Sequence, residues 1–342
     1  MLSIRLLSTK NPYYCILIIS GLEMKWFFLI FCVYISGIVV YAQQRPQFSQ
    51  YMLNKYYENP AYGGLERSLS VFTSYRDQYS SFPGNPRTFY LGADLPFYLW
   101  NGAIGISLYN QSSGHLNNTN FRFSYNYVMG LESGFLSFGG RLGLDYMNFD
   151  GRKIITPDGD YEATINHKDP LLEANVFNGV GPSWEIGTYF MSAQWQGGIT
   201  VSEFPSHSYG LGNASYTRRW GGSIFAEYKY EWDDRIKFYP SLLVKADPSV
   251  VQADISLVAI LDRNIIGGVG MRGYSTSSFD AITILMGTNI GSKYKLYYSY
   301  DFGLSSLRTA HQGTHEIMLS YNLQKLIGLG LPPKIIYNPR DM

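Results

Sequence analysis

The sequence predicts an all-β fold: a transmembrane antiparallel β-barrel of about 14 strands, with a short N-terminal helix capping or plugging its periplasmic side. Charged residues make up only 15% of the chain, against roughly 25% in ordinary soluble domains. The chain contains 30 Tyr, 20 Phe and 35 Gly residues. After Gly64, apolar and polar residues alternate with a period of two almost everywhere, which is typical of strands with two different faces.

The chain opens with a segment that resembles a secretory leader. Lys25 precedes a continuous apolar run from Trp26 to Val40, and Ala42 supplies the small side chain that signal peptidase requires. We expect cleavage before Gln43, so that residues 1–42, upstream residues and signal peptide together, are removed. The alternative is a membrane anchor, but the run is shorter than the roughly 20 residues that a spanning helix needs.

Cysteine and charge content narrow the range of functions. Both cysteines, Cys15 and Cys32, lie in the expected leader. The mature chain would therefore contain no disulfide, no Cys metal site and no Cys nucleophile. The net charge is +1, from 27 basic and 26 acidic residues, and this balance gives no support for nucleic-acid binding.

Residues 43–66 are expected to form the cap or plug. Four apolar residues within 48–58 fall at i, i+3, i+4 and i+8, which predicts one apolar stripe on a short helix. Asn59-Pro60 would end this helix, because proline has no N–H to donate and restricts the residue before it. An ordinary ordered arm is the alternative. The residues expected to anchor the cap are Phe48, Tyr51, Met52, Asn59 and Pro60.

Residues 67–323 are expected to form the barrel, and most of the predicted strands reach the roughly 9–11 residues that span a bilayer. The predicted strands are 68–76, 87–97, 101–110, 119–129, 134–148, 178–190, 194–203, 217–230, 235–246, 250–262, 264–274, 279–290, 293–303 and 313–323.

The connections between these strands tend to alternate between long and short. The long ones are 77–86, 111–118, 149–177, 204–216 and 304–312, whereas 247–249 and 275–278 break the pattern. Barrels of outer membranes have long outer loops and tight periplasmic turns. A secreted β-sandwich is the alternative fold, and it gives no reason for this segregation.

In a barrel, the polar faces of the strands meet the lumen, because lipid offers polar groups no partner. Both signs of charge occur on these faces, which favours an interior cross-linked by ion pairs. The alternative is the solvent face of a soluble sheet. The charged residues assigned to the lumen are Asp94, Arg122, Arg141, Asp145, Glu227, Lys229, Asp254, Arg272, Asp301 and Glu316.

We find no motif that predicts catalysis, so we expect no enzyme, no cofactor and no metal site. The glycine pattern of 268–273 is followed by Tyr-Ser-Thr-Ser-Ser rather than by a helix, as a nucleotide site would require. His311 and His315 lie on a loop entering a strand without clustered ligands. The acidic turn 158–162 leaves calcium binding open, since oxygen-rich loops suit that ion.

Several motifs resemble one family. Residues 46–52 (PQFSQYM), followed by Asn59-Pro60-Ala61, resemble the N-terminal signature of the PorP/SprF family, outer-membrane proteins of the type IX secretion system in Bacteroidetes. Residues 298–302 (YSYDF) and 313–317 (GTHEI) resemble its C-terminal region, and 240–245 (PSLLVK) is a weaker match. Together these motifs bracket the expected mature chain.

The resemblance implies a non-enzymatic accessory of type IX protein secretion, one that supports export or surface anchoring of a large adhesin-like cargo. Some relatives are associated with gliding motility. The implied partners are a cargo with a C-terminal targeting region, the translocon with its periplasmic ring, and outer-membrane lipid, but no nucleic acid. A passive porin-like channel for small solutes is the alternative function.

The chain departs from the family pattern at three places. Thr314 stands where the family usually has Ser. The loop 149–177 is long, and we expect it to contact the cargo. Residues 324–342 continue beyond the last predicted strand as a periplasmic tail.

Overall fold

The computed structural model describes residues 45–97, 100–161, 165–168, 174–211, 214–248, 250–274 and 277–327. The expected leader, residues 1–42, and the expected tail beyond residue 327 lie outside the described residues. Within the described ranges, no helix combines the length and the apolar character needed to cross a membrane.

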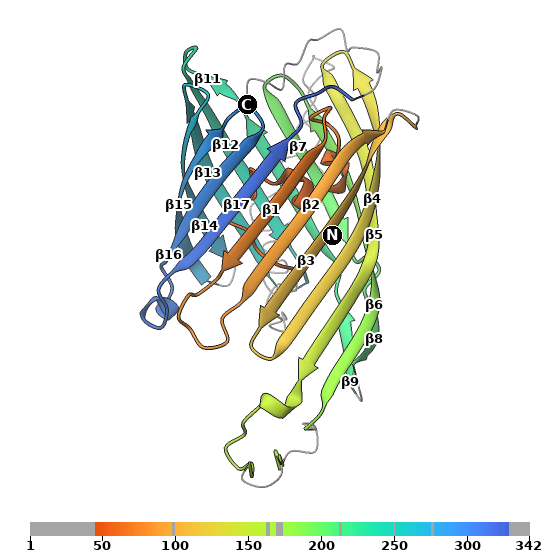
Figure 1. The fold of residues 1–342 in the computed structure, drawn as a ribbon, viewed down its shortest axis with the longest axis vertical. Helices are drawn as coiled ribbons and strands as arrows, with labels where there is room; N and C mark the ends of the chain where they lie inside the picture. Colours follow the sequence, from red (N-terminus) through yellow and green to blue (C-terminus); the bar gives the residue numbers. More distant parts are fainter. Residues whose placement is uncertain are drawn as a thin grey trace, which may run out of the picture. The chain divides into compact units, whose positions relative to one another are not determined.

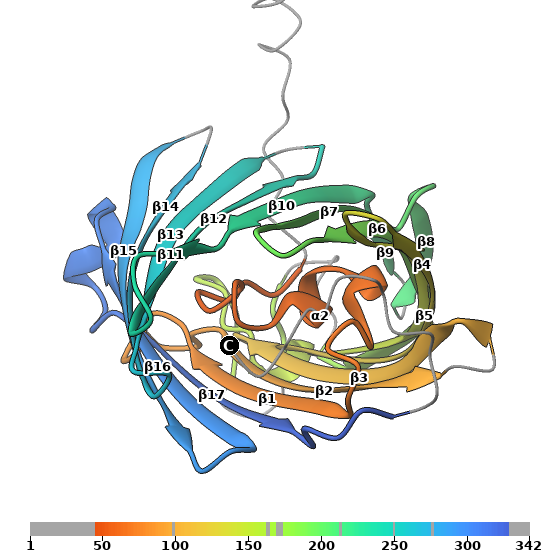
Figure 2. The same cartoon turned by 90° about the horizontal axis from the view of Figure 1, so that it is seen from above.

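Fourteen antiparallel strands form a closed barrel in the described part of the chain (Figures 1 and 2). Neighbours in sequence are neighbours in the wall; β1 pairs with β17, and β10 joins β7 to β12, so the ring closes. The predicted barrel is therefore confirmed. The wall strands are β1 (Ser70–Asp77), β2 (Arg87–Phe97), β3 (Gly102–Ser113), β4 (Leu116–Leu131), β5 (Gly134–Asp150), β6 (Val176–Met191), β7 (Trp195–Ser202), β10 (Gly221–Tyr228), β12 (Ile236–Ala246), β13 (Val251–Leu261), β14 (Ile265–Tyr274), β15 (Ser277–Ile290), β16 (Tyr294–Gly303) and β17 (Thr314–Asn322).

Three short strands lie outside this regular wall. β8 (His207–Leu211) and β9 (Ala214–Arg218) form a separate hairpin, and β11 (Tyr230–Glu231) extends the sheet beside β12. The single strand predicted at 217–230 is therefore wrong, because the end of β9 and the start of β10 belong to different sheets. The structure also has short helical turns at η3 (Gly151–Lys153) and η4 (Ser306–Thr309).

The connections are segregated by length, as expected for a membrane barrel. The long connections 78–86, 151–175, 203–220 and 304–313 all join strands at one end, here called the loop end (lower edge of Figure 1). The opposite end is the turn end, from which the chain enters β1 and leaves β17. In outer-membrane barrels, long loops face outward and short turns face the periplasm.

One predicted long connection, 111–118, is wrong. β3 and β4 continue to a tight turn at Gly114, whose φ is +58°. The polar residues that looked like a loop instead pair across the two strands: the Asn110 Nδ2 donates to Asn117 Oδ1 at 2.8 Å and to Thr119 Oγ1 at 2.7 Å.

The two faces of the wall differ in chemistry. In β16, Ser299 and Asp301 are buried on the inner face, whereas Phe302 is exposed on the outer face. Leu142 on β5 and Ile186 on β6 are 69% and 64% exposed. An apolar outer surface on a closed barrel is the surface that lipid covers in an outer-membrane protein.

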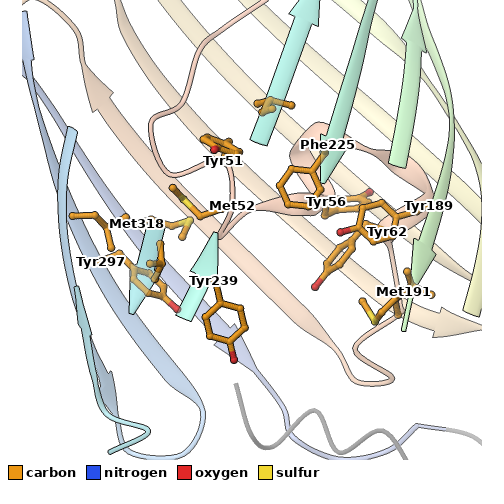
Figure 3. Close-up of a cluster of buried hydrophobic side chains, with 14 of the residues drawn as sticks. Tyr51, Met52, Tyr56, Tyr62, Tyr189, Met191, Phe225, Tyr239, Tyr297 and Met318 are labelled. Atoms are coloured by element: carbon orange, nitrogen blue, oxygen red, sulfur yellow. The ribbon is translucent and has the colours of Figure 1, made fainter. Parts of the chain in front are cut away.

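The apolar core lies inside the barrel, between its wall and the N-terminal segment 45–69. Figure 3 shows Tyr51, Met52, Tyr56 and Tyr62 of this segment among inward side chains of several strands. The Tyr62 ring meets the Tyr189 ring edge-on, with centroids 5.2 Å apart. The barrel is consequently packed inside as well as paired along its wall.

Inward glycines make room for this segment. A Cβ on Gly139 of β5 would lie 2.6 Å from the backbone N and Cα of Ala61, and a Cβ on Gly187 of β6 would lie 2.3 Å from Asn59 Oδ1. Since real Cβ contacts are never this short, the absence of a side chain at these two strand positions lets the segment approach the wall.

Candidate functional site in the barrel lumen

The N-terminal segment has less helix than the sequence predicted. Only α2 (Lys55–Glu58) is α-helical, η1 (Pro60–Tyr62) is a 3₁₀ turn, and residues 49–53 form turns. The expected helix over 48–58 is therefore wrong in extent. Asn54 explains where α2 begins, because its side chain accepts a hydrogen bond from the Tyr57 N–H. Figure 2 shows α2 inside the ring of strands.

The apolar cap residues contact the wall in different directions. The Phe48 ring packs edge-on against Tyr57 at 4.7 Å and against Tyr90 of β2 at 6.0 Å. The Tyr51 hydroxyl lies 3.2 Å from Ser241 Oγ and 3.1 Å from Ser256 Oγ, so it contacts β12 and β13. A regular helix would have aimed these side chains along one stripe, whereas the turns at 49–53 spread them around the lumen.

Met52 belongs to the same buried core as Tyr51, and it is 5% exposed. Pro60 is the first residue of η1. Its lack of an N–H costs no hydrogen bond there, because the first N–H groups of a helix have no partner within the helix. Both residues thus lie inside the lumen, as does the rest of the expected anchor set.

Asn59 joins two strands of the wall to the segment. Its Nδ2 donates to the carbonyl oxygens of Thr188 on β6, at 2.9 Å, and Ile199 on β7, at 3.2 Å. Its Oδ1 accepts from the Ala61 N–H at 2.9 Å. One side chain therefore fixes both the turn after α2 and the position of that turn against β6 and β7.

Ser49 is the centre of a charged network near the loop end. The Ser49 Oγ lies 2.6 Å from Asp301 Oδ2 and accepts from Arg76 Nη1 at 2.7 Å. The Ser49 N–H donates to Glu316 Oε2 at 2.7 Å. Arg272 adds an ion pair to Asp254 at 2.7 Å and a hydrogen bond to Ser49 Oγ at 3.1 Å.

This network brings the two sequence motifs together. Ser49 and Gln50 come from the N-terminal motif, and Asp301 and Glu316 come from the two C-terminal motifs. The Gln50 Nε2 donates to Ser299 Oγ at 3.1 Å and to the Glu316 carbonyl at 3.0 Å. Residues about 250 positions apart in the chain thus form one buried site.

A second charged cluster surrounds Glu185 of β6. Its carboxylate pairs with Arg141 at 2.8 Å, with Arg45 at 2.9 Å and with Arg122 at 3.6 Å. The Arg141 guanidinium also donates to the carbonyl oxygens of Tyr56 and Tyr57, and it lies 4.7 Å from the Tyr56 ring centroid. Arg141 therefore holds the end of α2 against β5.

Other charges fix the segment from further sides. The Lys55 Nζ pairs with Glu227 Oε1 of β10 at 2.8 Å, and Lys245 of β12 pairs with Glu58 at 2.8 Å. The Gly64 N–H donates to Asp94 Oδ1 at 2.7 Å, near the turn end of β2. The segment thus contacts the wall from the Ser49 network near the loop end to Gly64 near the turn end.

Asp145 of β5 anchors the hairpin β8–β9, which enters the lumen from the loop end. Its carboxylate pairs with Arg218 of β9 and accepts from the Tyr209 hydroxyl of β8 at 2.7 Å. Arg218 also donates to the Tyr109 hydroxyl at 3.2 Å. The connection 203–220 therefore folds into the lumen, which the sequence did not indicate.

Nine of the ten charged residues that the sequence assigned to the lumen are at most 5% exposed in the structure. The tenth, Lys229, follows β10 and has a side chain that is 16% exposed. Sequence reasoning omitted several further charges of these networks, among them Arg45, Arg76, Glu185 and Arg218. Arg76 and Glu185 lie at inward positions of alternating strands, so their place in the alternation could have identified them. Arg45 belongs to an irregular segment and carries no such pattern, and Arg218 ends β9, a short strand outside the wall.

Two further ion pairs lie at the rims of the barrel, one at each end. The Arg152 side chain hydrogen-bonds the Asp150 carboxylate at the loop end and lowers the pKa of Asp150 to about 2. At the turn end, the hydrogen bond from Arg235 holds the pKa of Asp262 below its usual value.

The lumen networks bind the segment to the wall. Within the described ranges, no group of three or more His, Cys, Asp or Glu side chains could hold a metal ion. Breaking one buried ion pair leaves an uncompensated charge and typically costs about 3–5 kcal/mol. The arrangement therefore holds one position of the segment strongly.

Comparison with known proteins provides the family. No curated protein matches the chain. Among solved structures, the Acinetobacter baumannii outer membrane protein Omp33 has 6% identity and a TM-score of 0.45, covering 75% of this chain and 97% of its own. The Pseudomonas putida toluene transporter TodX has 10% identity and a TM-score of 0.45, covering 83% of this chain and 94% of its own.

These structural similarities are too low to support an argument about function. The family model of the type IX secretion system membrane protein PorP/SprF, in contrast, matches residues 40–321. That range covers most of the chain, including the N-terminal segment and all but the last residue of the wall strands. The chain therefore belongs to the PorP/SprF family of type IX secretion system membrane proteins, and it is an outer-membrane β-barrel.

Proposed function

We propose that this type IX secretion component supports the export or surface anchoring of a large adhesin-like protein, through protein–protein contacts rather than through a solute pore. The observation that carries this proposal is the occupied lumen. Segment 45–69 contacts the wall from Gln47, which donates to the Tyr274 hydroxyl at 2.7 Å, to Gly64 beside Asp94. A barrel filled in this way suits a scaffold for other proteins.

The long connections are the surfaces that we assign to the cargo. Connections 151–175 and 203–220 lie at the loop end, where an exported protein would arrive. The turn end, where the connections are short, would meet the translocon and its periplasmic ring. We propose that the segment 43–66 acts as the plug, anchored by Phe48, Tyr51, Met52, Asn59 and Pro60.

Surface proteomics of a deletion strain tests the secretion role. We expect one or a few large proteins to disappear from the cell surface, while the other outer-membrane proteins keep their amounts. Re-expression of the wild-type chain should restore the missing proteins. An unchanged surface proteome would contradict the proposal.

Conductance in planar bilayers tests the alternative of a passive channel. We expect the full-length chain to conduct little and a chain lacking residues 46–60 to conduct more. A heat-modifiability gel on both preparations checks that each barrel is folded. High, steady conductance of the full-length chain would favour a channel for small solutes instead.

A further inference from the structure

One strand of the wall has an open edge at the loop end. β5 pairs with β6 from Phe135–Met191 to Asp150–Val176, but β7 pairs with β6 only from Glu185 to Met191. Residues 176–184 of β6 therefore have a strand partner on one side only. In Figure 1, β5 and β6 run past neighbouring wall strands at the lower edge.

The direction of the free backbone groups follows from two contacts. The Trp184 carbonyl accepts from the Glu203 N–H at 3.0 Å, and the Pro182 carbonyl lies 2.8 Å from His207 Nε2. Both contacts are on the side away from β5. Because backbone direction alternates along a strand, the N–H and C=O of Val180, Asn178 and Val176 also point away from β5. Among the described residues, these backbone groups have no hydrogen-bond partner.

The hairpin β8–β9 does not cover this edge, because it packs on the inner face of β6. A Cβ on Gly179 would lie 2.5 Å from the Gly210 carbonyl oxygen, and one on Gly181 would lie 2.2 Å from the Tyr209 ring. Gly179 and Gly181 project into the lumen, whereas the free N–H and C=O groups lie in the plane of the sheet. The edge and the hairpin therefore occupy different sides of β6.

The open edge lies outside the hydrocarbon. On the outer face, Asn178 Oδ1 accepts from the Tyr146 hydroxyl at 2.9 Å and from Asn148 Nδ2 at 2.6 Å. This polar cluster lies nearer the loop end than the exposed Leu142 and Ile186, and it marks where the wall leaves the lipid. Unpaired backbone groups in contact with lipid would be too costly to persist, and in water they are available to a partner.

We propose that the β6 edge at residues 176–180 binds an extended segment of the exported protein by strand addition. This proposal rests on the proposed function and names the binding mode. Backbone hydrogen bonds supply affinity in such complexes, and pockets for alternate side chains supply specificity. Val176 and Val180, 37% and 60% exposed, offer apolar contacts to the added strand on either side of Asn178. Pro182, which has no N–H, limits the site on the side of the membrane.

A second copy of this chain fits the edge less well than an exported segment. Two copies in one membrane both have β6 running from the loop end toward the turn end. Their edges therefore cannot pair antiparallel, and a two-fold axis along the membrane normal makes two tilted strands cross. A segment that arrives from outside has no such restriction on its direction.

Val180→Pro tests the edge, with Val180→Ala as the matched control for the side chain. Proline removes the Val180 N–H, which points away from β5, so no bond of the barrel ladder is lost. Pro182 already occupies an equivalent position two residues later. Asn178→Pro, with Asn178→Ala as its control, repeats the test. The probe is the surface protein that is missing from the deletion strain, measured on intact cells and in the medium.

We expect each proline variant to retain about fivefold less of this protein on the cell surface than its alanine control, the effect of about one hydrogen bond. Photo-crosslinking from a benzoyl-phenylalanine at Val180 should capture the same protein through an extended segment. Equal retention in proline and alanine variants, or a crosslinker that never reaches this protein, would overturn the edge proposal alone. An unchanged surface proteome in the deletion strain would overturn the proposed function as well.

Discussion

Arg76 and Glu316 are direct partners in the ladder between β1 and β17, and their side chains form an ion pair at 2.9 Å on the inner face. β1 and β17 are the first and last strands, so this pair lies on the junction that closes the barrel. Ser49 contacts both side chains, through its hydroxyl to Arg76 and its N–H to Glu316. The segment before the first strand is therefore part of the same junction.

The first prediction concerns this junction. Arg76→Met should lower the free energy of unfolding by roughly 3–5 kcal/mol, because Asp301 and Glu316 lose a buried cation. Arg87→Met is the control, since Arg87 is exposed and pairs with Asp77 at the rim, where an ion pair contributes about 0–1 kcal/mol. Urea titration of the heat-modifiable band measures both. Equal losses in the two variants would contradict the role of the network.

The second prediction concerns the fit of the segment against the wall. Gly139→Val should displace the segment, because even a Cβ at this position would overlap the backbone of Ala61. Lys55, which is 8% exposed in the wild type, should become open to trypsin, and conductance should rise. Gly130→Val is the matched control, since no heavy atom outside its chain neighbours lies within 4 Å of a Cβ there. A segment that stays protected in Gly139→Val would refute the tight fit.

The third prediction concerns the hairpin β8–β9. Asp145→Asn should release the hairpin from the lumen, because Arg218 loses its carboxylate partner. We expect faster trypsin cleavage after Arg218 in intact cells. Asp150→Asn should leave the cleavage rate unchanged, since Asp150 pairs at the rim with the exposed Arg152 and Lys153. Identical cleavage patterns in wild type and Asp145→Asn would argue against this anchor.

The fourth prediction concerns the lipid-facing surface. Ile284 and Ile290 both project outward from β15, at mid-strand and at the turn end. Ile284→Lys should cost roughly 2–4 kcal/mol, and Ile290→Lys about 0–1 kcal/mol, because a cation costs most at the bilayer midplane. Folding into vesicles, followed by urea titration, measures the difference. A larger loss for Ile290→Lys would show that the assignment of membrane depth is wrong.

The wall of the barrel could be predicted from the sequence because alternation is a local property. In β16, every second residue turns inward, and the predicted strand 293–303 differs from β16 by one residue. The same alternation identified Asp301 as an inward residue. It could not identify which cation would meet it, since Arg76 comes from β1, at the other end of the chain.

The inner segments could not be predicted because their conformation depends on the wall around them. The stripe from Phe48 to Tyr56 has helical spacing, yet the Ser49 and Gln50 amides bond Glu316 rather than a helical carbonyl. The connection 203–220 likewise folds inward because Tyr209 and Arg218 donate hydrogen bonds to Asp145 there. Contacts between residues so far apart in the chain produce no periodic pattern in the sequence.

The position of Ser49 makes the N-terminal segment depend on the last two strands of the wall, β16 and β17. Its partners Asp301 and Glu316 lie on β16 and β17, so a chain that stopped before β16 would offer neither. In such a product the leading segment would lack its acidic partners and would remain accessible to proteases. Seating of the segment in the lumen would thus require that the ring of strands is complete.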